Sequence, residues 1–229
     1  MTAQVLAMRP ATFRQPIQIQ PVHKGVGSGL PAVFKMMGAP MTFCRNEEVF
    51  GEGETAEYLY QVKTGCVRTY KVLSDGRRQV GAFYLPGDVF GIEAADEHVF
   101  SAEAIVPSTI TVLKRSTVIS RAAGDCTLAR QLLELTVSEL QRTQSHVLLL
   151  IKTAQERVAG FLLEMAGRAS NRAEIELPMS RQDIADYLGL TIETVSRTLT
   201  HLENTSAIAL PSSRRIVLRN HSALSRFNA

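Results

Sequence analysis

The segment of residues 180–202 carries the pattern that most constrains the fold of this chain. Ser180 followed by Asp183 predicts a capped helix start, and Gly189 predicts the tight turn that ends this helix. Thr191 predicts the cap of a second helix. Small and apolar residues at helical spacing give the two helices a common inner face: Ile184, Ala185, Leu188, Val195, Leu199 and Leu202. This pattern predicts a helix-turn-helix.

The outer face of the second helix is the candidate for direct contact with bases. Ile192, Glu193, Ser196 and Arg197 fall in its first two turns, the part of a recognition helix that reaches base edges. Arg197 can donate two hydrogen bonds to guanine, and Glu193 can accept one from the amino group of cytosine. Because these two residues are four apart, the alternative is a surface salt bridge, worth roughly a few tenths of a kcal/mol. The turn pattern around them favours base contact.

Phosphate contacts are expected from the helix ends and from a C-terminal wing. The segments 208–210 and 215–219 alternate like two strands, and a helix over 155–168 and a strand near 174–178 precede the helix-turn-helix. The net charge of +3 is modest, so contacts with nucleic acid must be local. The candidates for backbone contact are polar or basic: Ser180, Arg181, Thr191, Thr194, Arg214 and Arg215.

The preceding residues predict a separate β-domain. Over residues 41–115, short apolar segments alternate with glycine-containing turns, and Ser74-Asp75-Gly76 lies between two alternating segments, a strong hairpin pattern. We therefore expect a small antiparallel barrel or jelly roll. Residues 1–40 are rich in proline and glycine and predict a flexible arm.

A helix over residues 116–152 is expected to link the two domains and to form a parallel homodimer. Its stripe alternates in steps of four and three, as in a coiled-coil seam: Leu133, Val137, Leu140, Gln144, Val147 and Ile151. The alternative is that this stripe packs on the chain's own barrel.

The segment from Asp183 to Arg197 closely resembles the helix-turn-helix of the Crp/Fnr family of bacterial transcription regulators. Residues 51–53, 60–67 and 86–91 resemble the family's cyclic-nucleotide-binding-like barrel. The resemblance covers about residues 41–220 and implies an α+β chain with a winged helix-turn-helix. Within it, Glu193, Ser196 and Arg197 match the E-x-x-S-R pattern of the Fnr type. That match implies contact with palindromes like TTGAT-N4-ATCAA, and the family implies a regulator of transcription, an activator that contacts RNA polymerase.

The resemblance is nearest to the FixK type, which has neither cluster nor nucleotide. An iron–sulfur cluster needs four thiolates in most proteins, and this chain has only Cys44, Cys66 and Cys126. The arginine that neutralises a cyclic phosphate is replaced by an apolar residue before Ser101, although Arg68, Arg77 or Arg78 remain as substitutes. The five histidines have no metal-ligand spacing. We expect no cofactor and no metal.

Other functions also fit these residues. A small-molecule pocket between barrel and long helix is the main alternative, and repression is another, because the same DNA contact can block polymerase. No nucleophile–base pair or phosphate loop indicates an enzyme.

No apolar segment is long enough for a membrane span, and the start of the chain has no secretory pattern. Isolated cysteines favour a reducing cytoplasm. Ser180 at a helix start should be inert to oxidation, unlike a cysteine there.

Overall fold

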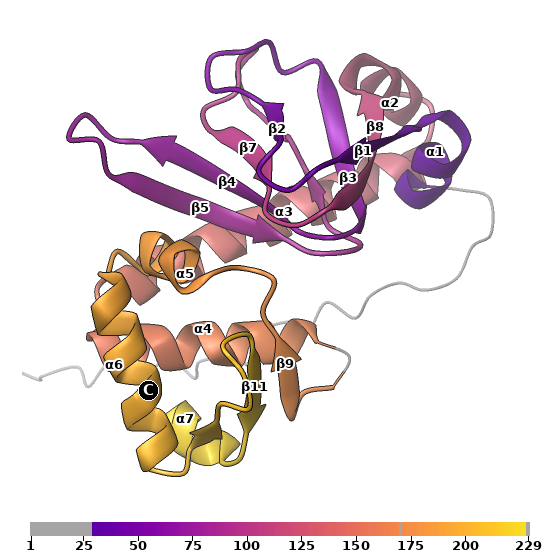
Figure 1. Cartoon of the computed structure of the whole chain (residues 1–229). Helices are drawn as coiled ribbons and strands as arrows, with labels where there is room; N and C mark the ends of the chain where they lie inside the picture. Colours follow the sequence, from indigo (N-terminus) through magenta and orange to yellow (C-terminus); the bar gives the residue numbers. More distant parts are fainter. Residues whose placement is uncertain (1–28, 170, 228–229) are drawn as a thin grey trace, which may run out of the picture.

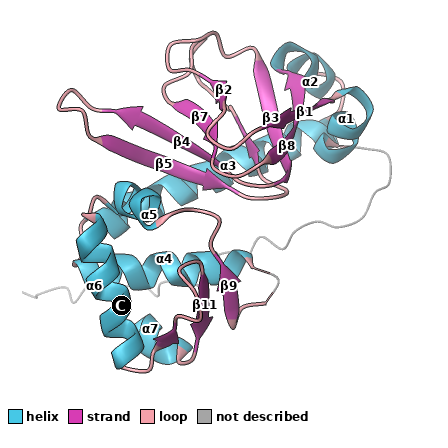
Figure 2. Ribbon diagram, viewed as in Figure 1, coloured by secondary structure: helices cyan, strands magenta, loops and turns pink. Residues whose placement is uncertain are grey.

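A β-barrel and a helical domain make up the protein, and a long helix runs from one to the other (Figure 1). The computed structural model describes residues 29–169 and 171–227. The predicted arm of residues 1–40 lies largely outside this part of the chain. Helices and strands are mixed in the α+β manner that the sequence predicts (Figure 2).

The barrel is a jelly roll of two antiparallel four-stranded sheets, in the orders β1-β8-β3-β6 and β2-β7-β4-β5. Its strands are β1 (Ala39–Phe43), β2 (Glu48–Phe50), β3 (Tyr58–Thr64), β4 (Val67–Val72), β5 (Arg78–Tyr84), β6 (Val89–Phe90), β7 (Ser101–Ala104) and β8 (Ser108–Lys114). Aromatic rings of Phe50, Tyr60 and Phe90 pack together in its core. Strands β4 and β5 form the predicted hairpin, with Gly76 at φ 82° in its turn.

The end of the predicted arm is ordered, which corrects the expectation for residues 30–40. Helix α1 (Leu30–Met37) begins there, and β1 follows it. Leu30, Val33 and Phe34 are buried against the barrel and the long helix. Pro31 lies in the first turn, where its missing N–H has no partner to lose. The proline was therefore a helix start rather than a sign of disorder.

The segment predicted as a single helix over 116–152 is two helices. Helix α2 (Arg115–Ala122) ends before Gly124, and α3 (Cys126–Leu150) begins anew. The carboxylate of Asp125 caps α3 by accepting from the backbone N–H groups of Thr127 and Leu128, at 2.9 and 3.1 Å. The long seam therefore lies on α3 alone, with Ile151 just beyond its last turn.

The C-terminal domain has the predicted winged helix-turn-helix architecture. Helix α4 (Ala154–Arg168) leads to β9 (Glu174–Glu176), α5 (Arg181–Leu188), α6 (Ile192–Asn204), β10 (Ile208–Ala209), β11 (Arg215–Leu218) and α7 (His221–Phe227). The wing is a three-stranded antiparallel sheet, in the order β10-β11-β9. The earlier strand β9 thus joins the two strands expected from the alternation.

A single hydrophobic cluster joins the two domains. Cys66, Val80, Phe83 and Ile105 from the barrel belong to the same buried cluster as the inner faces of α4, α5 and α6. Helix α5 lies directly beneath β5 in Figure 1. The helix-turn-helix is therefore packed on the barrel and does not hang from the linker alone.

Candidate DNA interface

The first helix of the motif begins at a complete capping box. The Ser180 hydroxyl accepts from the Asp183 N–H at 3.1 Å, and the Asp183 carboxylate accepts from the Ser180 N–H at 2.8 Å. At the other end, Gly189 adopts φ 62° and ψ 40°, a left-handed conformation that favours glycine. These local interactions fix both ends of α5, as the sequence predicts.

The second helix, α6, is amphipathic in the predicted sense. Thr191 caps it by accepting from the Thr194 N–H at 3.2 Å. Its inner residues Val195, Leu199 and Leu202 are buried. Ile192, Glu193 and Arg197 are exposed, and Ser196 is half-buried beside them. The first two turns therefore present to solvent the side chains expected to contact bases.

The side chains of Glu193 and Arg197 are both exposed, and their contacts within the chain are local to the start of α6. The Arg197 Nε donates to the backbone carbonyl of Glu193 at 3.4 Å, so the side chain lies along the helix surface. The Glu193 backbone N–H and the Thr191 hydroxyl hold the pKa of the Glu193 carboxyl below its usual range. The carboxylate is therefore ionised at neutral pH and suited to accept hydrogen bonds from a base.

The six candidates for contact with the DNA backbone do not lie together in the structure. Thr191 and Thr194 lie at the start of α6, beside the outward face. Ser180 and Arg214 line a small pocket of about 220 Å³ between the domains, and the Ser180 hydroxyl is engaged with Asp183 at 2.7 Å. Arg181 is half-buried. Arg215 is exposed but forms an ion pair with Glu174 of the wing sheet.

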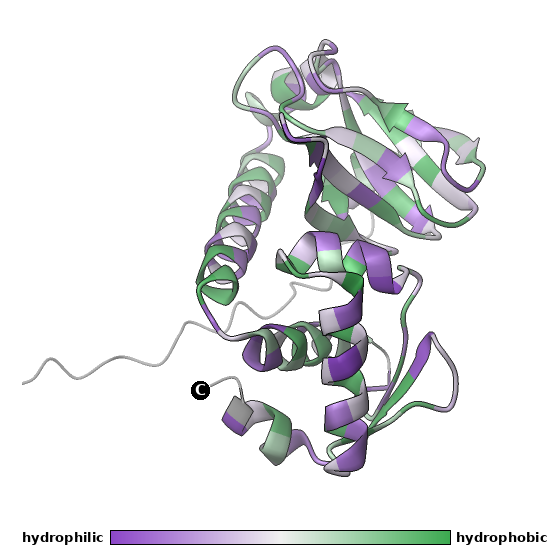
Figure 3. Cartoon of the chain, turned by 60° about the vertical axis from the view of Figure 1, so that its left-hand side comes forward, coloured by the Kyte–Doolittle hydropathy of each residue, from purple (hydrophilic) through white to green (hydrophobic). Residues whose placement is uncertain are grey.

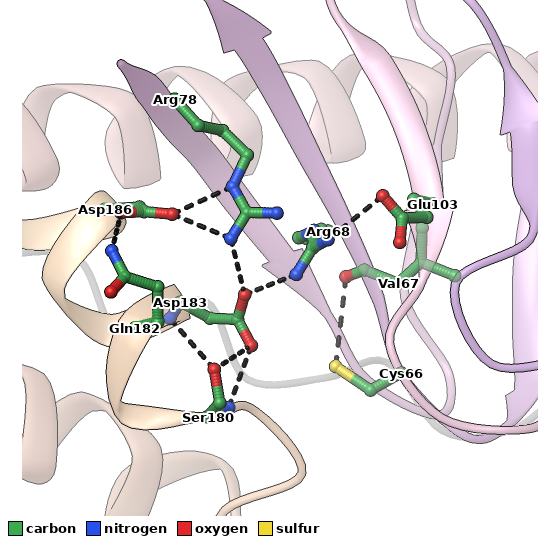
Figure 4. A network of polar contacts seen from close by, with 9 residues as sticks. All are labelled: Cys66, Val67, Arg68, Arg78, Glu103, Ser180, Gln182, Asp183 and Asp186. Carbon is green, nitrogen blue, oxygen red and sulfur yellow. Dashed lines mark hydrogen bonds and ion pairs between the residues drawn. The ribbon is translucent and has the colours of Figure 1, made fainter. Parts of the chain in front are cut away.

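A polar network that sequence analysis missed holds α5 to the β4–β5 hairpin (Figure 4). Arg68 and Arg78 both donate to Oδ1 of Asp183. Arg78 also donates to Asp186 Oδ2, at 2.8 Å from its Nε, and Arg68 to Glu103 at 3.0 Å. The sequence carried one signal of this network: Asp183 and Asp186 lie on a helix of a DNA-binding motif, where DNA phosphates would repel them, so these carboxylates needed partners within the protein.

The far end of α5 is held by α3. The imidazole of His146 stacks on the ring of Tyr187, with centroids 4.0 Å apart. Its Nε2–H donates to the Tyr187 carbonyl oxygen at 2.7 Å, so the proton lies on Nε2 when the ring is neutral. Burial lowers the pKa of His146, and the nearby Arg142 adds to the effect, while the bond to Tyr187 opposes it.

This environment predicts a pH-dependent stability. Because the pKa of His146 is lower in the folded chain, the unfolded chain takes up the proton first as the pH falls below about 6.5. The free energy of unfolding should therefore be highest above that pH and decline as the solution is acidified. Urea unfolding of the wild type and of His146→Gln between neutral and mildly acidic pH measures this, and the variant should lose less stability. The exposed His201→Gln should follow the wild type; parallel curves for wild type and His146→Gln would contradict the prediction.

The predicted dimer stripe is exposed along α3 in the single chain. The exposed fractions are 64% for Leu133, 56% for Leu140, 57% for Val147 and 79% for Ile151. Gln144 is also exposed and Val137 is half-buried. Figure 3 shows hydrophobic residues along this long helix. The barrel therefore leaves most of the stripe uncovered, although Leu140 also borders the space between the barrel and α3.

A cavity of about 600 Å³ lies between the barrel and α3. Polar side chains such as Glu93, Thr136, Arg142 and Thr143 line it together with apolar residues. Arg142 is already engaged: it bonds Glu139 at 2.5 Å, and its guanidinium lies 4.4 Å from the centre of the Tyr84 ring. Three other arginines could have replaced the family's phosphate-binding arginine, but they lie outside this cavity. Arg68 and Arg78 pair with acidic residues of α5, and Arg77 pairs with Asp75 at 2.7 Å.

Cys44, Cys66 and Cys126 all carry free thiols. Cys66 is buried in the barrel, and burial raises the pKa of its thiol to about 12, whereas Cys44 and Cys126 are exposed. Within residues 29–169 and 171–227, no group of three or more His, Cys, Asp or Glu side chains is placed to hold a metal ion. Among the same residues, no helix is long and apolar enough to cross a membrane.

Comparison with known proteins bears directly on this geometry. A Crp-like helix-turn-helix domain matches residues 156–227, and a cyclic nucleotide-binding domain matches residues 40–125. The nitrogen fixation regulation protein FixK of Azorhizobium caulinodans is 53% identical over 209 residues, which cover 88% of this chain and 84% of that protein. The chain belongs to the Crp/Fnr family of transcription regulators. FixK of Rhizobium meliloti is 41% identical, over 95% of this chain and 98% of the relative.

A relative of known structure shares the fold over most of this chain. The structure of FixK2 from Bradyrhizobium japonicum matches with a TM-score of 0.82 and 49% identity, covering 85% of this chain and 98% of that one. These matches confirm the predicted resemblance to FixK proteins. As a transcription regulator with a helix-turn-helix DNA-binding domain, the protein is not an enzyme.

Proposed function

We propose that the protein binds palindromes resembling TTGAT-N4-ATCAA as a homodimer and activates transcription. The observation that carries the proposal is the outward face of α6, where Glu193, Ser196 and Arg197 lie together at the start of an exposed helix. With α6 in the major groove, Arg197 donates to guanine and Glu193 accepts from cytosine. Thr191 and Thr194 are proposed to contact the DNA phosphates beside these bases. Arg181 and Arg215 are the next candidates for phosphate contact, whereas Ser180 and Arg214 line the pocket between the domains and are the weaker candidates.

The homodimer places two such helices for the two halves of a palindrome. An uncovered apolar stripe of coiled-coil spacing on α3 supports it, with Leu133, Leu140 and Val147 more than half exposed. A two-fold axis along this seam requires an inverted repeat with half-sites about one helical turn apart.

Control without an iron–sulfur cluster or a cyclic nucleotide is part of the proposal. Only three cysteines are present, and within residues 29–169 and 171–227 they belong to no group of potential metal ligands, which supports the first point. A cyclic phosphate needs an available cation in the barrel cavity. Arg68, Arg77 and Arg78 do not line that cavity, and Arg142, which does, is already paired with Glu139; this supports the second point. We place the protein in the cytoplasm with its DNA and RNA polymerase.

Titration onto labelled duplexes tests this function. Purified protein in air and without ligand should bind the palindrome tightly and a scrambled duplex weakly, at one fixed salt concentration, because phosphate contacts alone depend on salt. Equal, weak binding to both duplexes would overturn a ligand-free regulator of this palindrome. Transcription with purified RNA polymerase separates activation from repression: transcript should increase when the palindrome lies upstream of the promoter.

A small-molecule effector is the second candidate, favoured by the 600 Å³ cavity. That volume is typical of ligand pockets, and its lining combines apolar walls with a few polar groups. Adding cyclic AMP in the same titration tests the cyclic nucleotide; a gain in affinity for the palindrome would favour this candidate over ligand-free control.

A further inference from the structure

The network between α5 and the β4–β5 hairpin is buried enough to fix a geometry. The side chains of Arg68 and Asp183 are each 7% exposed, and Asp186 is 12% exposed where it meets Arg78 at 2.7 Å. A charge left alone at such depth would be costly, so each of these residues needs its partners in place. The network therefore resists small rotations of α5 against the barrel.

One carboxylate ties the start of α5 to the barrel. Asp183 uses Oδ1 for Arg68 and Arg78, and Oδ2 for the N–H and hydroxyl of Ser180. The helix cap and the contact with β4 and β5 are thus the same side chain (Figure 4). Moving the start of α5 would break both sets of bonds together.

The end of α5 is held as well. The Tyr187 carbonyl oxygen accepts from Gln79 Nε2 of β5 at 3.3 Å and from His146 of α3 at 2.7 Å. Helix α5 passes directly into α6 through the Gly189 turn, and the two helices share a buried inner face. A fixed α5 therefore fixes the direction of α6.

Electrostatics point the same way. The first helix of a helix-turn-helix crosses the DNA backbone, where unpaired carboxylates would repel phosphates. Asp183 and Asp186 are instead turned to the arginines of the hairpin. Acidic residues at these positions suit attachment to the barrel rather than contact with DNA.

We propose that Arg68 and Arg78 are positioning residues for DNA recognition. They hold α5 against the barrel and so set the separation of the two α6 helices in the homodimer, and with it the half-site spacing that the protein selects. This inference rests on the proposed function, because it presumes a homodimer on a palindrome.

The test measures spacing preference as well as affinity. Wild type and Arg78→Ala are titrated onto inverted repeats whose central spacer is shortened or lengthened by one and by two base pairs. Wild type should bind the repeat with the four-base-pair spacer roughly tenfold or more tightly than the others, because base contacts are lost at a displaced half-site. With Arg78→Ala the preference should narrow to about threefold or less, because a loosened domain adjusts to several spacings. A purely stabilising role would leave the spacing profile unchanged.

Matched variants complete the design. Lys71→Ala removes a cation from the same hairpin, but Lys71 pairs with Glu52 at 2.7 Å within the barrel, so the wild-type profile should persist. The exchange Arg78→Asp with Asp186→Arg should restore part of the preference. Arg78→Lys keeps the charge but loses the two-point contact, and it gives the decisive profile if thermal unfolding shows that Arg78→Ala is not folded.

The outcomes separate the two proposals. A folded Arg78→Ala or Arg78→Lys variant with the full wild-type spacing preference overturns the positioning role and leaves the proposed function intact. A wild type that does not distinguish the palindrome from a scrambled duplex overturns the proposed function instead.

Discussion

Replacing Arg197 with alanine should weaken binding to the palindrome by roughly 5- to 150-fold for each half-site, about 1–3 kcal/mol. The exposed guanidinium at the second turn of α6 is the group suited to donate two hydrogen bonds to the guanine of TTGAT. A dimer carries two copies, so the full palindrome should show a larger loss than a single half-site. Fluorescence anisotropy at one fixed salt concentration measures both.

The informative comparison uses altered DNA. Changing the guanine of each half-site should cost the wild type affinity but cost the Arg197→Ala variant almost nothing further, because the contact is already gone. Arg130→Ala removes another exposed cation, on α3, which is 60% exposed and paired with Glu134 in the same helix; this variant should bind as the wild type does. Equal losses for wild type and Arg197→Ala on the altered DNA would show that Arg197 does not contact this base.

Leu140→Glu should convert the dimer to monomers and abolish tight binding to the palindrome. Leu140 lies in the middle of the exposed stripe of α3, 56% exposed in the single chain. In a parallel seam, two glutamates would face each other in an apolar contact, and burying unpaired charge costs several kcal/mol, about a hundredfold or more in the dimer dissociation constant. Sedimentation equilibrium reports the change directly.

A control for this variant lies on the same helix. Ser145 is exposed but off the stripe, so Ser145→Glu adds the same charge and should remain dimeric. Circular dichroism should show unchanged helix content in both variants, because glutamate is a good helix former. A Leu140→Glu protein that stays dimeric at micromolar concentration would place the contact between chains elsewhere.

The helix-turn-helix was predictable because its determinants are local. Ser180, Asp183, Gly189 and Thr191 each act on backbone groups within three or four residues, and all four interact as expected. The hairpin turn at Ser74-Asp75-Gly76 was predictable for the same reason. Local hydrogen bonds of this kind can be predicted from a sequence without knowledge of the tertiary structure.

Docking of α5 was not predictable, because it depends on partners far apart along the chain. Arg68 and Asp183 are 115 residues apart, and neither has a local pattern that names the other. Helix α1 was missed for a related reason: its buried side chains Leu30, Val33 and Phe34 find their partners on β3, β8 and α3. The break before α3 was visible in principle, since Gly124 and Asp125 are ordinary helix end and start residues.

The hydrophobic cluster shared by Cys66, Val80, Phe83 and Ile105 with α4, α5 and α6 has a consequence for modularity. A fragment of residues 153–229 would keep the side chains proposed to contact DNA but lose the buried apolar residues of the barrel that pack with α5. Chimaeras that exchange DNA-binding domains between relatives must therefore exchange the matching hairpin face as well. In this chain the two family matches end and begin at residues 125 and 156, but one buried hydrophobic cluster spans both of them.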